Sequence, residues 1–398
     1  MTPPSSSITN MKRIFAGLGL CMTVWVTGMQ LILTDSAKID RGEIRDIDTK
    51  LQINRTPEPT TTPRPRTVPT TGLQRTTGPI RQREPKTVIE RGHEPIKVPT
   101  LAQEPTSERV LVIYAYAEID DWRHSIRKSN LQFFVDFAIG GKHHNKSDVD
   151  YVIVVNGYTC TVDIPEQDNT FVIARRNYGY DACAWKAALD YMRKRKGPAW
   201  YKYFVFLNSS VKGPFIPAYA NDKHWTTYFT KYLNNYVKLV GTSICCSKVY
   251  PVHIQTMFLV TSFSGLALIE DMLKCHEHKQ TVIVNIEIGV SQFLLKNGFN
   301  IASVMKQWED HDFRDKDRTE EMCRTHNKDM DGDQYYQNAY YDGIDISPFE
   351  VIFFKNNRGV NQKVHDVYSS MIREWGEKYS PNKPTGYIGK YSKNYILL

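Results

Sequence analysis

The stretch that most constrains how this chain can fold is residues 171–217. It contains two short apolar runs, Phe171–Ala174 and Tyr203–Leu207, each stopped by polar residues as in the strands of a buried sheet. Between them, residues 182–195 predict a helix, because apolar side chains recur at helical spacing and cations gather in the last turn. The expected buried face comprises Ala184, Ala187, Ala188 and Tyr191.

Polar residues follow both predicted strands, at the ends where α/β units bind their ligands. The first strand leads into two cations, an amide, a turn-forming glycine and a carboxylate: Arg175, Arg176, Asn177, Gly179 and Asp181. The second strand leads into Asn208, Ser209 and Ser210. Asp181 is also a favourable N-cap residue for the predicted helix, so its type and place leave a ligand role and a capping role open.

These residues carry a resemblance. RRNYGYDACAWKAAL followed by YFVFLNSSVKGPF resembles the core of a divergent group of membrane-anchored glycosyltransferases, distantly similar to rhamnan-synthesis-type enzymes. The resemblance runs through about residues 109–358 and includes DYVIVVNG, HIQTMF and EIGVSQFLLKNGF. It implies a single Rossmann-like GT-A domain that transfers sugar from a nucleotide-sugar to a glycan or glycoprotein acceptor.

The order of predicted elements favours the same α/β class with a mainly parallel sheet of about five strands. Further strands are expected at 109–116, 150–157, 237–243 and 256–262, with a last one within 347–359. Helices are expected at 127–139, 224–235, 264–275, 287–297 and 364–379, followed by a polar surface tail from Ser380.

The part of the chain before this domain divides into three pieces. Residues 14–33 form an uncharged segment that is long enough to cross a bilayer. Lys12 and Arg13 before it favour a cytosolic tail at 1–13. A cleaved signal peptide is the alternative. Residues 34–107 hold ten prolines and fourteen threonines but no aromatic residue, so they predict a disordered stem. The catalytic domain, 108–398, would then be lumenal, in the Golgi or endoplasmic reticulum.

The chemistry of glycosyl transfer assigns candidate roles. A leaving diphosphate needs cations or helix N-termini, for which Arg175 and Arg176 are suited. Asn177 and Asp181 are candidates to hold base, ribose or donor sugar. Glu287, expected to open a helix, is a candidate catalytic carboxylate with Asp181, although dipole-favoured placement explains it equally well.

Four residues farther along the chain are candidates for contact with the acceptor or the phosphates. These are His253 and Gln255, before a predicted strand, and Lys355 and Arg358, after the last one. For His253 a structural role is the alternative.

The site lacks a feature that the resemblance leads one to expect. GT-A enzymes usually carry an Asp-x-Asp metal motif where this chain has Asn208-Ser209-Ser210. Whether Mn²⁺ or Mg²⁺ takes part is therefore open, and weak or absent metal dependence is expected. Other acidic runs, at 148–150, 309–317 and 331–333, are expected to be solvated surface.

Other classes of function fit less well. A non-catalytic lectin-like or adhesion protein on the same fold is the main alternative. A sulfotransferase would need a basic phosphate loop after its first strand, where residues 117–121 are acidic. The net charge of +8 is spread along the chain and no zinc-finger spacing occurs, which disfavours nucleic-acid binding. Of seven cysteines, six lie in the globular part, where they are either disulfide-bonded, in a pairing that the sequence leaves open, or buried thiols.

The orientation of the chain can be tested with microsomes. We expect a C-terminal tag to be protected from added protease until detergent is present, because the positive residues before 14–33 favour a cytosolic N-terminus. Digestion of the tag without detergent would reverse the topology.

Overall fold

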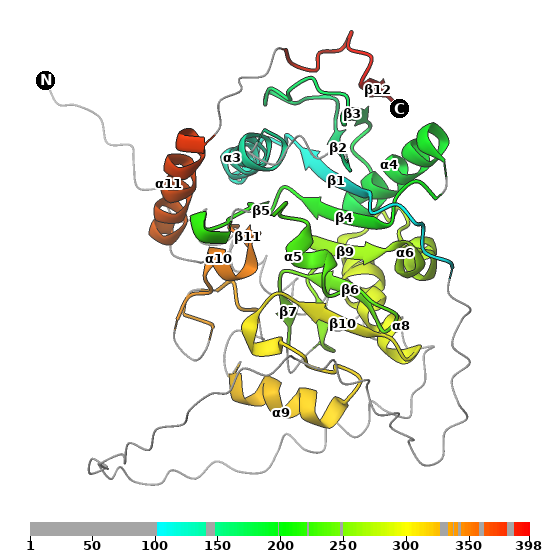
Figure 1. Cartoon of the computed structure of the whole chain (residues 1–398), viewed down its shortest axis with the longest axis vertical. Coiled ribbons are helices and arrows are strands. Elements are labelled where there is room, and N and C mark those ends of the chain that lie inside the picture. Colours follow the sequence, from blue (N-terminus) through cyan, green and yellow to red (C-terminus); the bar gives the residue numbers. More distant parts are fainter. Residues whose placement is uncertain are drawn as a thin grey trace, which may run out of the picture. The chain divides into compact units, whose positions relative to one another are not determined.

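The structure is a computed structural model (Figure 1), which describes most of the chain after residue 101. The described ranges are 102–140, 148–197, 199–220, 223–246, 250–326, 333–336, 338–340, 344–357, 362–379 and 386–398. All of them fall within the compact unit Val88–Leu398. The expected tail and anchor, and the expected stem up to residue 101, lie outside the described residues. None of the helices in the described ranges is long and apolar enough to cross a bilayer.

The centre of the fold is an eight-stranded sheet in the order β10-β6-β9-β4-β1-β2-β3-β12. Every neighbouring pair is parallel except those made by β9, which is antiparallel to both β4 and β6. The α/β class with a mainly parallel sheet is therefore confirmed. The strands are β1 Val110–Ala117, β2 Val149–Asn156, β3 Thr170–Arg175, β4 Tyr203–Asn208, β6 Val237–Gly241, β9 Phe258–Ser262, β10 Asn300–Ser303 and β12 Tyr395–Leu397.

The strand order reverses next to β1, and this positions the site. The chain adds β2 and then β3 on one side of β1, and then crosses to place β4 on the other side. The carboxyl ends of β1 and β4 therefore diverge into their following loops at a topological switch point, where ligands bind in open α/β sheets.

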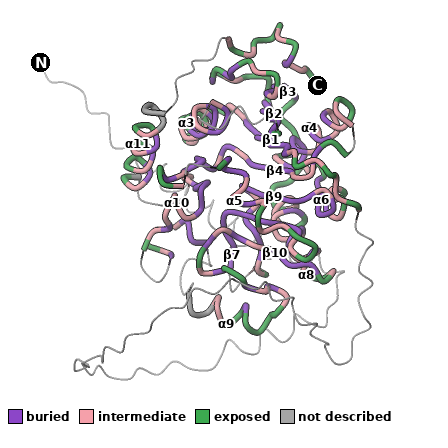
Figure 2. The backbone as a smooth tube through the Cα atoms, viewed as in Figure 1, coloured by how far each residue is buried: buried purple, intermediate pink, exposed green. Residues whose placement is uncertain are grey.

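Helices cover both faces of the sheet. On β1, Tyr114 packs its ring 4.9 Å from that of Phe134 in α3, His124–Phe134. Leu111 lies three residues before Tyr114, and because this number is odd its side chain points to the opposite face of the strand. There it lines a cavity with Leu189 of α4, Tyr180–Lys196. Figure 2 shows the strands between these helices as buried, which explains their nearly continuous apolar sequences.

The remaining helices are shorter or interrupted. A π-helical segment, Val135–Ile139, extends α3, and a 3-10 turn, Glu270–Met272, extends α6. Short 3-10 turns also occur at Ala218–Ala220 and Lys306–Trp308. The other helices are α5 Thr227–Thr230, α6 Phe263–Ile269, α7 Lys279–Val282, α8 Gly289–Lys296, α9 Lys316–His326, α10 Pro348–Val351 and α11 Gln362–Tyr379.

Several predicted elements differ from the structure. The helix expected at 224–235 is reduced to the four residues of α5. Residues 347–359 hold the short α10 and a two-residue strand, β11 Phe354–Lys355, which pairs with β5 Val211–Lys212 outside the main sheet. The tail expected on the surface contributes the edge strand β12 instead. These segments are too short for their periodicity to distinguish strand, turn and helix.

The helix around Glu287 begins earlier than expected. Its helical run starts at Lys279 with α7, passes through a π-helical segment, Ile283–Ile288, and continues as α8. Glu287 therefore lies inside the helical run rather than opening it, so dipole-favoured placement at an N-terminus does not explain this carboxylate.

The buried face of α4 is also shifted from the prediction. Ala187 and Tyr191 are only half-buried, whereas Trp185, Leu189 and Met192 are buried. Trp185 donates from its indole Nε1 to the carbonyl oxygen of Leu207, 3.2 Å away. The bulky side chains therefore determine which face of α4 is buried. The alanine spacing used for the prediction indicated residues at the edge of that face.

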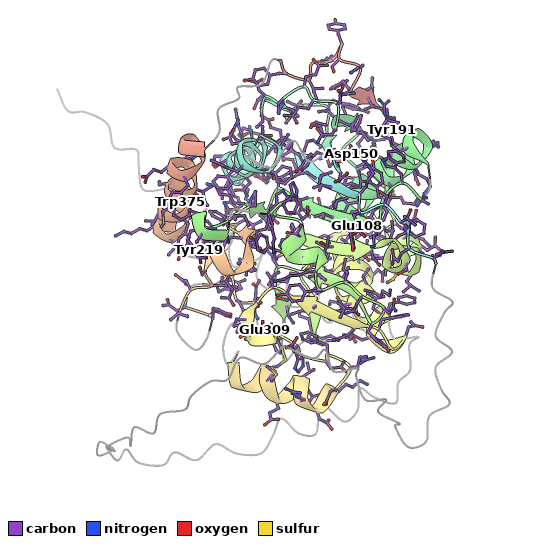
Figure 3. All side chains as sticks on the ribbon, in the orientation of Figure 1. Glu108, Asp150, Tyr191, Tyr219, Glu309 and Trp375 are labelled. Atoms are coloured by element: carbon purple, nitrogen blue, oxygen red, sulfur yellow. A yellow bond between two sulfur atoms is a disulfide. The ribbon has the colours of Figure 1, made fainter. Side chains whose placement is uncertain are left out.

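Buried polar groups at the amino edge of the sheet correct a further expectation. Asp150, labelled in Figure 3, was expected to be solvated but is 2 % exposed. Its carboxylate accepts hydrogen bonds from Arg109, at 3.2 Å, and from the Tyr201 hydroxyl, at 2.6 Å. Glu104, within the predicted stem, accepts hydrogen bonds from Ser262 and Ser264 at the start of α6. Residues ahead of position 108 thus make contacts to the domain.

Two disulfides occur in the described part of the chain, Cys183–Cys275 and Cys246–Cys323, while Cys160 forms none. The first joins the start of α4 to the loop after α6. Gly179 lies against it with φ +77°, and a Cβ there would come within 2.8 Å of the Cys183 Cβ and Sγ and 2.9 Å of the Cys275 Cβ. Both its backbone conformation and its missing side chain are therefore required.

Replacing this glycine tests the contact. We expect Gly179→Ala to lower the free energy of unfolding by about 2–4 kcal/mol, since the left-handed backbone costs about 1 kcal/mol and the overlap with the disulfide adds to it. Gly298→Ala is the matched control, because Gly298 has φ +80° and a Cβ there would have no atom within 4 Å apart from its chain neighbours. Denaturant unfolding measures both variants. Equal losses would show that the disulfide contact contributes nothing.

Candidate functional site

The carboxyl end of β4 and the first turn of α4 carry the central pair of the candidate site. Asn208, the last residue of β4, donates from its side-chain Nδ2 to the Asp181 carboxylate, 2.7 Å away. Its Oδ1 accepts from the Ser210 backbone N–H at 2.9 Å and from the Ser210 hydroxyl. Asn208 is thus held on both sides, and it joins two sequence motifs that lie 27 residues apart.

Asp181 does not act as the N-cap. The helix α4 begins at Tyr180, its N-cap is Gly179, and no side chain caps it. Asp181 lies in the first turn and directs its carboxylate to Asn208. Of the two roles that the sequence leaves open for Asp181, capping is therefore excluded.

Burial raises the pKa of the Asp181 carboxyl to about 6, the Asn208 hydrogen bond lowers it in part, and the charge of Glu287 raises it further. Burying a carboxylate near the charge of Glu287 costs free energy, and groups with such raised pKa values are common at functional sites. Asp181 is therefore a candidate functional group.

Arg175 is committed to the scaffold. Its guanidinium donates to the Asn156 side chain at the end of β2, to the Tyr178 carbonyl oxygen at 2.7 Å, and to the Cys183 sulfur at 3.1 Å. It is 8 % exposed, and burial lowers its pKa. Arg175 therefore fixes the turn that leads into α4, and the exposed cation of the pair is Arg176.

The turn itself presents exposed polar side chains. Arg176 and Asn177 are exposed, and among the described residues neither makes a side-chain hydrogen bond or ion pair. The Asn177 Cβ lies 3.7 Å from where a Cβ on Gly157 would stand, after β2. Tyr180 has φ +60°, which is a strained backbone for a tyrosine. The turn thus reaches across the ends of two strands.

The motif Asn208-Ser209-Ser210 is tied to a segment from near the end of the domain. Asn130 of α3 donates to the Ser209 carbonyl oxygen at 2.9 Å and exchanges two amide hydrogen bonds with Asn356, at 2.7 and 2.8 Å. β11 pairs with β5 directly after Ser210, with Lys355 opposite Val211. Lys355 does return beside the serine motif, as its candidate role required, and it is 8 % exposed.

A two-stranded ladder that follows β6 brings His253 to the same edge of the sheet as Asn208. β7, Ile244–Cys245, pairs with β8, His253–Ile254. His253 is 5 % exposed, and its Nδ1 lies 2.8 Å from the Pro251 carbonyl oxygen. Nδ1 therefore donates, which leaves Nε2 as the acceptor nitrogen. Gln255 is buried and accepts from the Ser243 hydroxyl at 2.7 Å, so its side chain supports the ladder.

Charges gather around His253. Burial lowers its pKa, so the ring is neutral at pH 7, while the Pro251 carbonyl, Glu287 and Asp333 favour the charged form and Lys355 opposes it. Glu287 acts on both Asp181 and His253, which places its carboxylate within electrostatic reach of both. Asp333 was expected to be solvated but is 8 % exposed, so that prediction is wrong for this residue.

The structure thus gathers Asp181, Asn208, Ser210, Glu287, His253 and Lys355 at one edge of the sheet. Arg358, the remaining candidate, lies outside the described residues, as do Asp331 and Gly332. Within the described ranges, no group of three or more His, Cys, Asp or Glu side chains is arranged to hold a metal ion.

Several site residues escaped the sequence interpretation. Asn156 could have been found from its place at the end of the strand DYVIVVN, by the same rule that selected Asn208. Asn130 carried no such signal, because it lies inside a predicted helix and its pairing with Asn356 spans 226 residues. Asp333 stands in a polar run in which nothing distinguishes one buried carboxylate from its exposed neighbours.

Comparison with known proteins adds little to this geometry. No known family profile matches the chain, and no curated protein sequence matches it. Among solved structures, it is similar to a protein from Desulfovibrio desulfuricans G20 named "putative nucleotide-diphospho-sugar transferase", with 12% identity and a TM-score of 0.28. The similarity covers 55% of this chain and 94% of that one. It is too distant to carry an argument.

The raised pKa of Asp181 predicts a pH-dependent stability. An unfolded Asp titrates near 3.9, so the folded state binds more protons between pH 4 and 6, and stability falls as pH rises through that range. We expect Asp181→Asn to be more stable than wild type by about 1–2 kcal/mol at pH 7.5, discounted for partial exposure, with most of the gain absent at pH 4.

Urea unfolding at the two pH values measures this difference. Asp190→Asn is the control on the same helix, because Asp190 pairs with Lys186 at the surface and its removal should bring no gain. An Asp181→Asn protein no more stable than wild type at pH 7.5 would contradict the raised pKa.

Proposed function

We propose that the protein is a glycosyltransferase that moves a sugar from a nucleotide-sugar donor to a glycan or glycoprotein acceptor. The observation that carries the proposal is the Asp181–Asn208 pair at the topological switch point of a mainly parallel sheet. The resemblance of the two motifs that contain these residues supports the same class. On this proposal the sheet and its covering helices form a GT-A-like nucleotide-sugar domain.

The geometry suggests a division of labour. Asp181 is ionised at neutral pH, and an ionised carboxylate is suited to accept hydrogen bonds from ribose or sugar hydroxyl groups. Asn208 orients it, while the turn at Asn177 and Gly179 shapes the donor side. Arg176, Lys355 and the uncapped N-terminus of α4 supply positive charge for a leaving diphosphate.

Two groups are candidates for the base that takes the acceptor proton. Glu287 lies in a π-helical segment, a feature frequent at functional sites. Neutral His253 presents Nε2 as a proton acceptor, because its Nδ1 is engaged. The proposal assigns the acceptor to this side of the site, between the π-helical segment and β8.

Metal dependence is proposed to be weak. The chain offers an amide and two serines where paired carboxylates would be expected, and Asn208 is already bonded on both sides. If Mn²⁺ or Mg²⁺ binds, Asp181 and the nearby Glu287 are the oxygen ligands available for it.

The proposed setting is the secretory pathway. Segment 14–33 would anchor the chain as a type II protein of the Golgi or endoplasmic reticulum membrane, with the domain in the lumen. The two disulfides are consistent with an oxidising compartment.

Donor hydrolysis and transfer test the proposal directly. A nucleotide-sugar panel is screened with wild type, Asp181→Asn and the control Asp190→Asn, each with EDTA or with Mn²⁺. We expect Asp181→Asn to lose about ten- to a hundredfold in turnover, the value of one charge-assisted hydrogen bond, without loss of stability. EDTA should leave most of the activity.

Three outcomes would contradict parts of this assignment. Wild-type turnover in Asp181→Asn would remove that residue from the site. Activity abolished by EDTA and restored by Mn²⁺ would overturn the metal proposal. A protein that binds glycans but neither transfers nor hydrolyses any donor would be the lectin-like alternative.

A further inference from the structure

A second polar cluster lies on the opposite face of the β5–β11 ladder from Lys355. Adjacent residues of a strand point to opposite faces, so Lys212 and its partner Phe354 face away from Val211 and Lys355. The helix α11 packs there, with the His365 ring 4.4 Å from the Phe354 ring. Figure 1 shows α11 beside α3 and near the β5–β11 ladder.

Lys212 is a buried cation with no anionic partner among the described residues. It is 8 % exposed, and its Nζ lies 5.1 Å from the centre of the Phe133 ring. Within the described part of the chain, no carboxylate lies within 4.0 Å of this ammonium. Burial and the charge of Arg373 lower its pKa to about 8, and exposed Asp366 opposes them only in part. An unpaired buried ammonium is costly enough to call for a counter-ion.

Two neighbouring groups on α11 are also unsatisfied. His365 is 1 % exposed, and neither ring nitrogen has a hydrogen-bond partner among the described residues. Ser369, one turn later, is 6 % exposed, and its hydroxyl has no partner in the same ranges. Burial and Lys212 lower the pKa of His365 to about 4, so the ring is neutral and can donate. Buried polar groups left in this way commonly mark an unseen water or ion.

A second cation completes the cluster. Arg373 follows Ser369 by one more turn on the same face of α11, and its Cζ lies 5.8 Å from the same Phe133 ring. One side of its guanidinium lies 3.6 Å from Asp136 of the α3 extension, and the side chain is 46% exposed. The cluster therefore spans from buried Lys212 to a partly exposed arginine, which gives a ligand an open side.

We propose that Lys212, His365, Ser369 and Arg373 bind an oxyanion, such as phosphate, sulfate or the sulfate ester of a glycan. Water would satisfy His365 and Ser369, but it would not neutralise the buried ammonium of Lys212, and Asp136 contacts only one side of the Arg373 guanidinium. An oxyanion does both, since its oxygens accept from ammonium, guanidinium, hydroxyl and imidazole donors. The site is separate from the candidate active site and lies on the other face of the ladder that holds Lys355.

The helix that carries the cluster is anchored independently. Trp375, labelled on α11 in Figure 3, stacks on Phe349 of α10 with ring centres 5.8 Å apart, and Tyr368 packs against the same ring at 4.6 Å. Substitutions at Lys212 or Ser369 therefore leave the main contacts of α11 in place.

Thermal unfolding of the purified full-length chain tests the site. We expect 50 mM sulfate or phosphate, against chloride at equal ionic strength, to raise Tm by about 2–4 °C, as for an anion with a Kd near 5 mM. Lys212→Met should lose this shift and should melt no lower than wild type in chloride, because it removes the buried charge. Ser369→Ala should reduce the shift, and Lys316→Met, at an exposed lysine, should keep it.

Two results would overturn the proposal: no sulfate shift in wild type, or an equal shift in wild type and Lys212→Met. If Lys212→Met does not fold, Ser369→Ala with a full shift overturns it in the same way. Calorimetry with galactose 6-sulfate, galactose and inorganic sulfate then identifies the source of the oxyanion. Tighter binding of the ester than of sulfate assigns a glycan, and equal binding assigns the free ion.

Discussion

The buried guanidinium of Arg175 is the interaction on which the site depends. It bonds to the end of β2, to the carbonyl of the following turn and to the sulfur of Cys183 in α4. Burial of a cation is costly, as its lowered pKa shows, and these hydrogen bonds offset that cost. Because they connect three elements, the backbone from 175 to 183 has little freedom.

That restriction determines where the candidate site lies. With the turn fixed, Gly179 must adopt φ +77° against the Cys183–Cys275 disulfide, and α4 begins at Tyr180. Asp181 then faces Asn208 across the switch point instead of capping its own helix. The disulfide also ties α4 to the loop after α6, which leads into the helical run that carries Glu287. The carboxylates are thus held from both sides of the site.

The small ladder β5–β11 brings residues from far along the chain to the same candidate site. It returns residues 354–356 to the end of β4, where the amide pair Asn130–Asn356 secures the Ser209 turn. One face of the ladder places Lys355 among the charges around His253, and the other face places Lys212 under α11. Because β5 and β11 are paired, a substitution of Lys355 or Lys212 would also affect the strand that carries the other lysine.

The sequence by itself determined the parts of this protein that depend on local pattern. Apolar runs located β1, β2, β3, β4, β6 and β9, helical spacing located α3, α4 and α11, and the polar residues after β3 and β4 indicated the candidate site. Only the tertiary structure decided the sheet order, the antiparallel direction of β9, the edge strand β12 and the position of Glu287 within its helix. It also decided that Arg175 is scaffold, that Asp181 bonds to Asn208, and that Asp333 is buried. These depend on contacts between residues far apart in the chain, and local periodicity carries no information about such contacts.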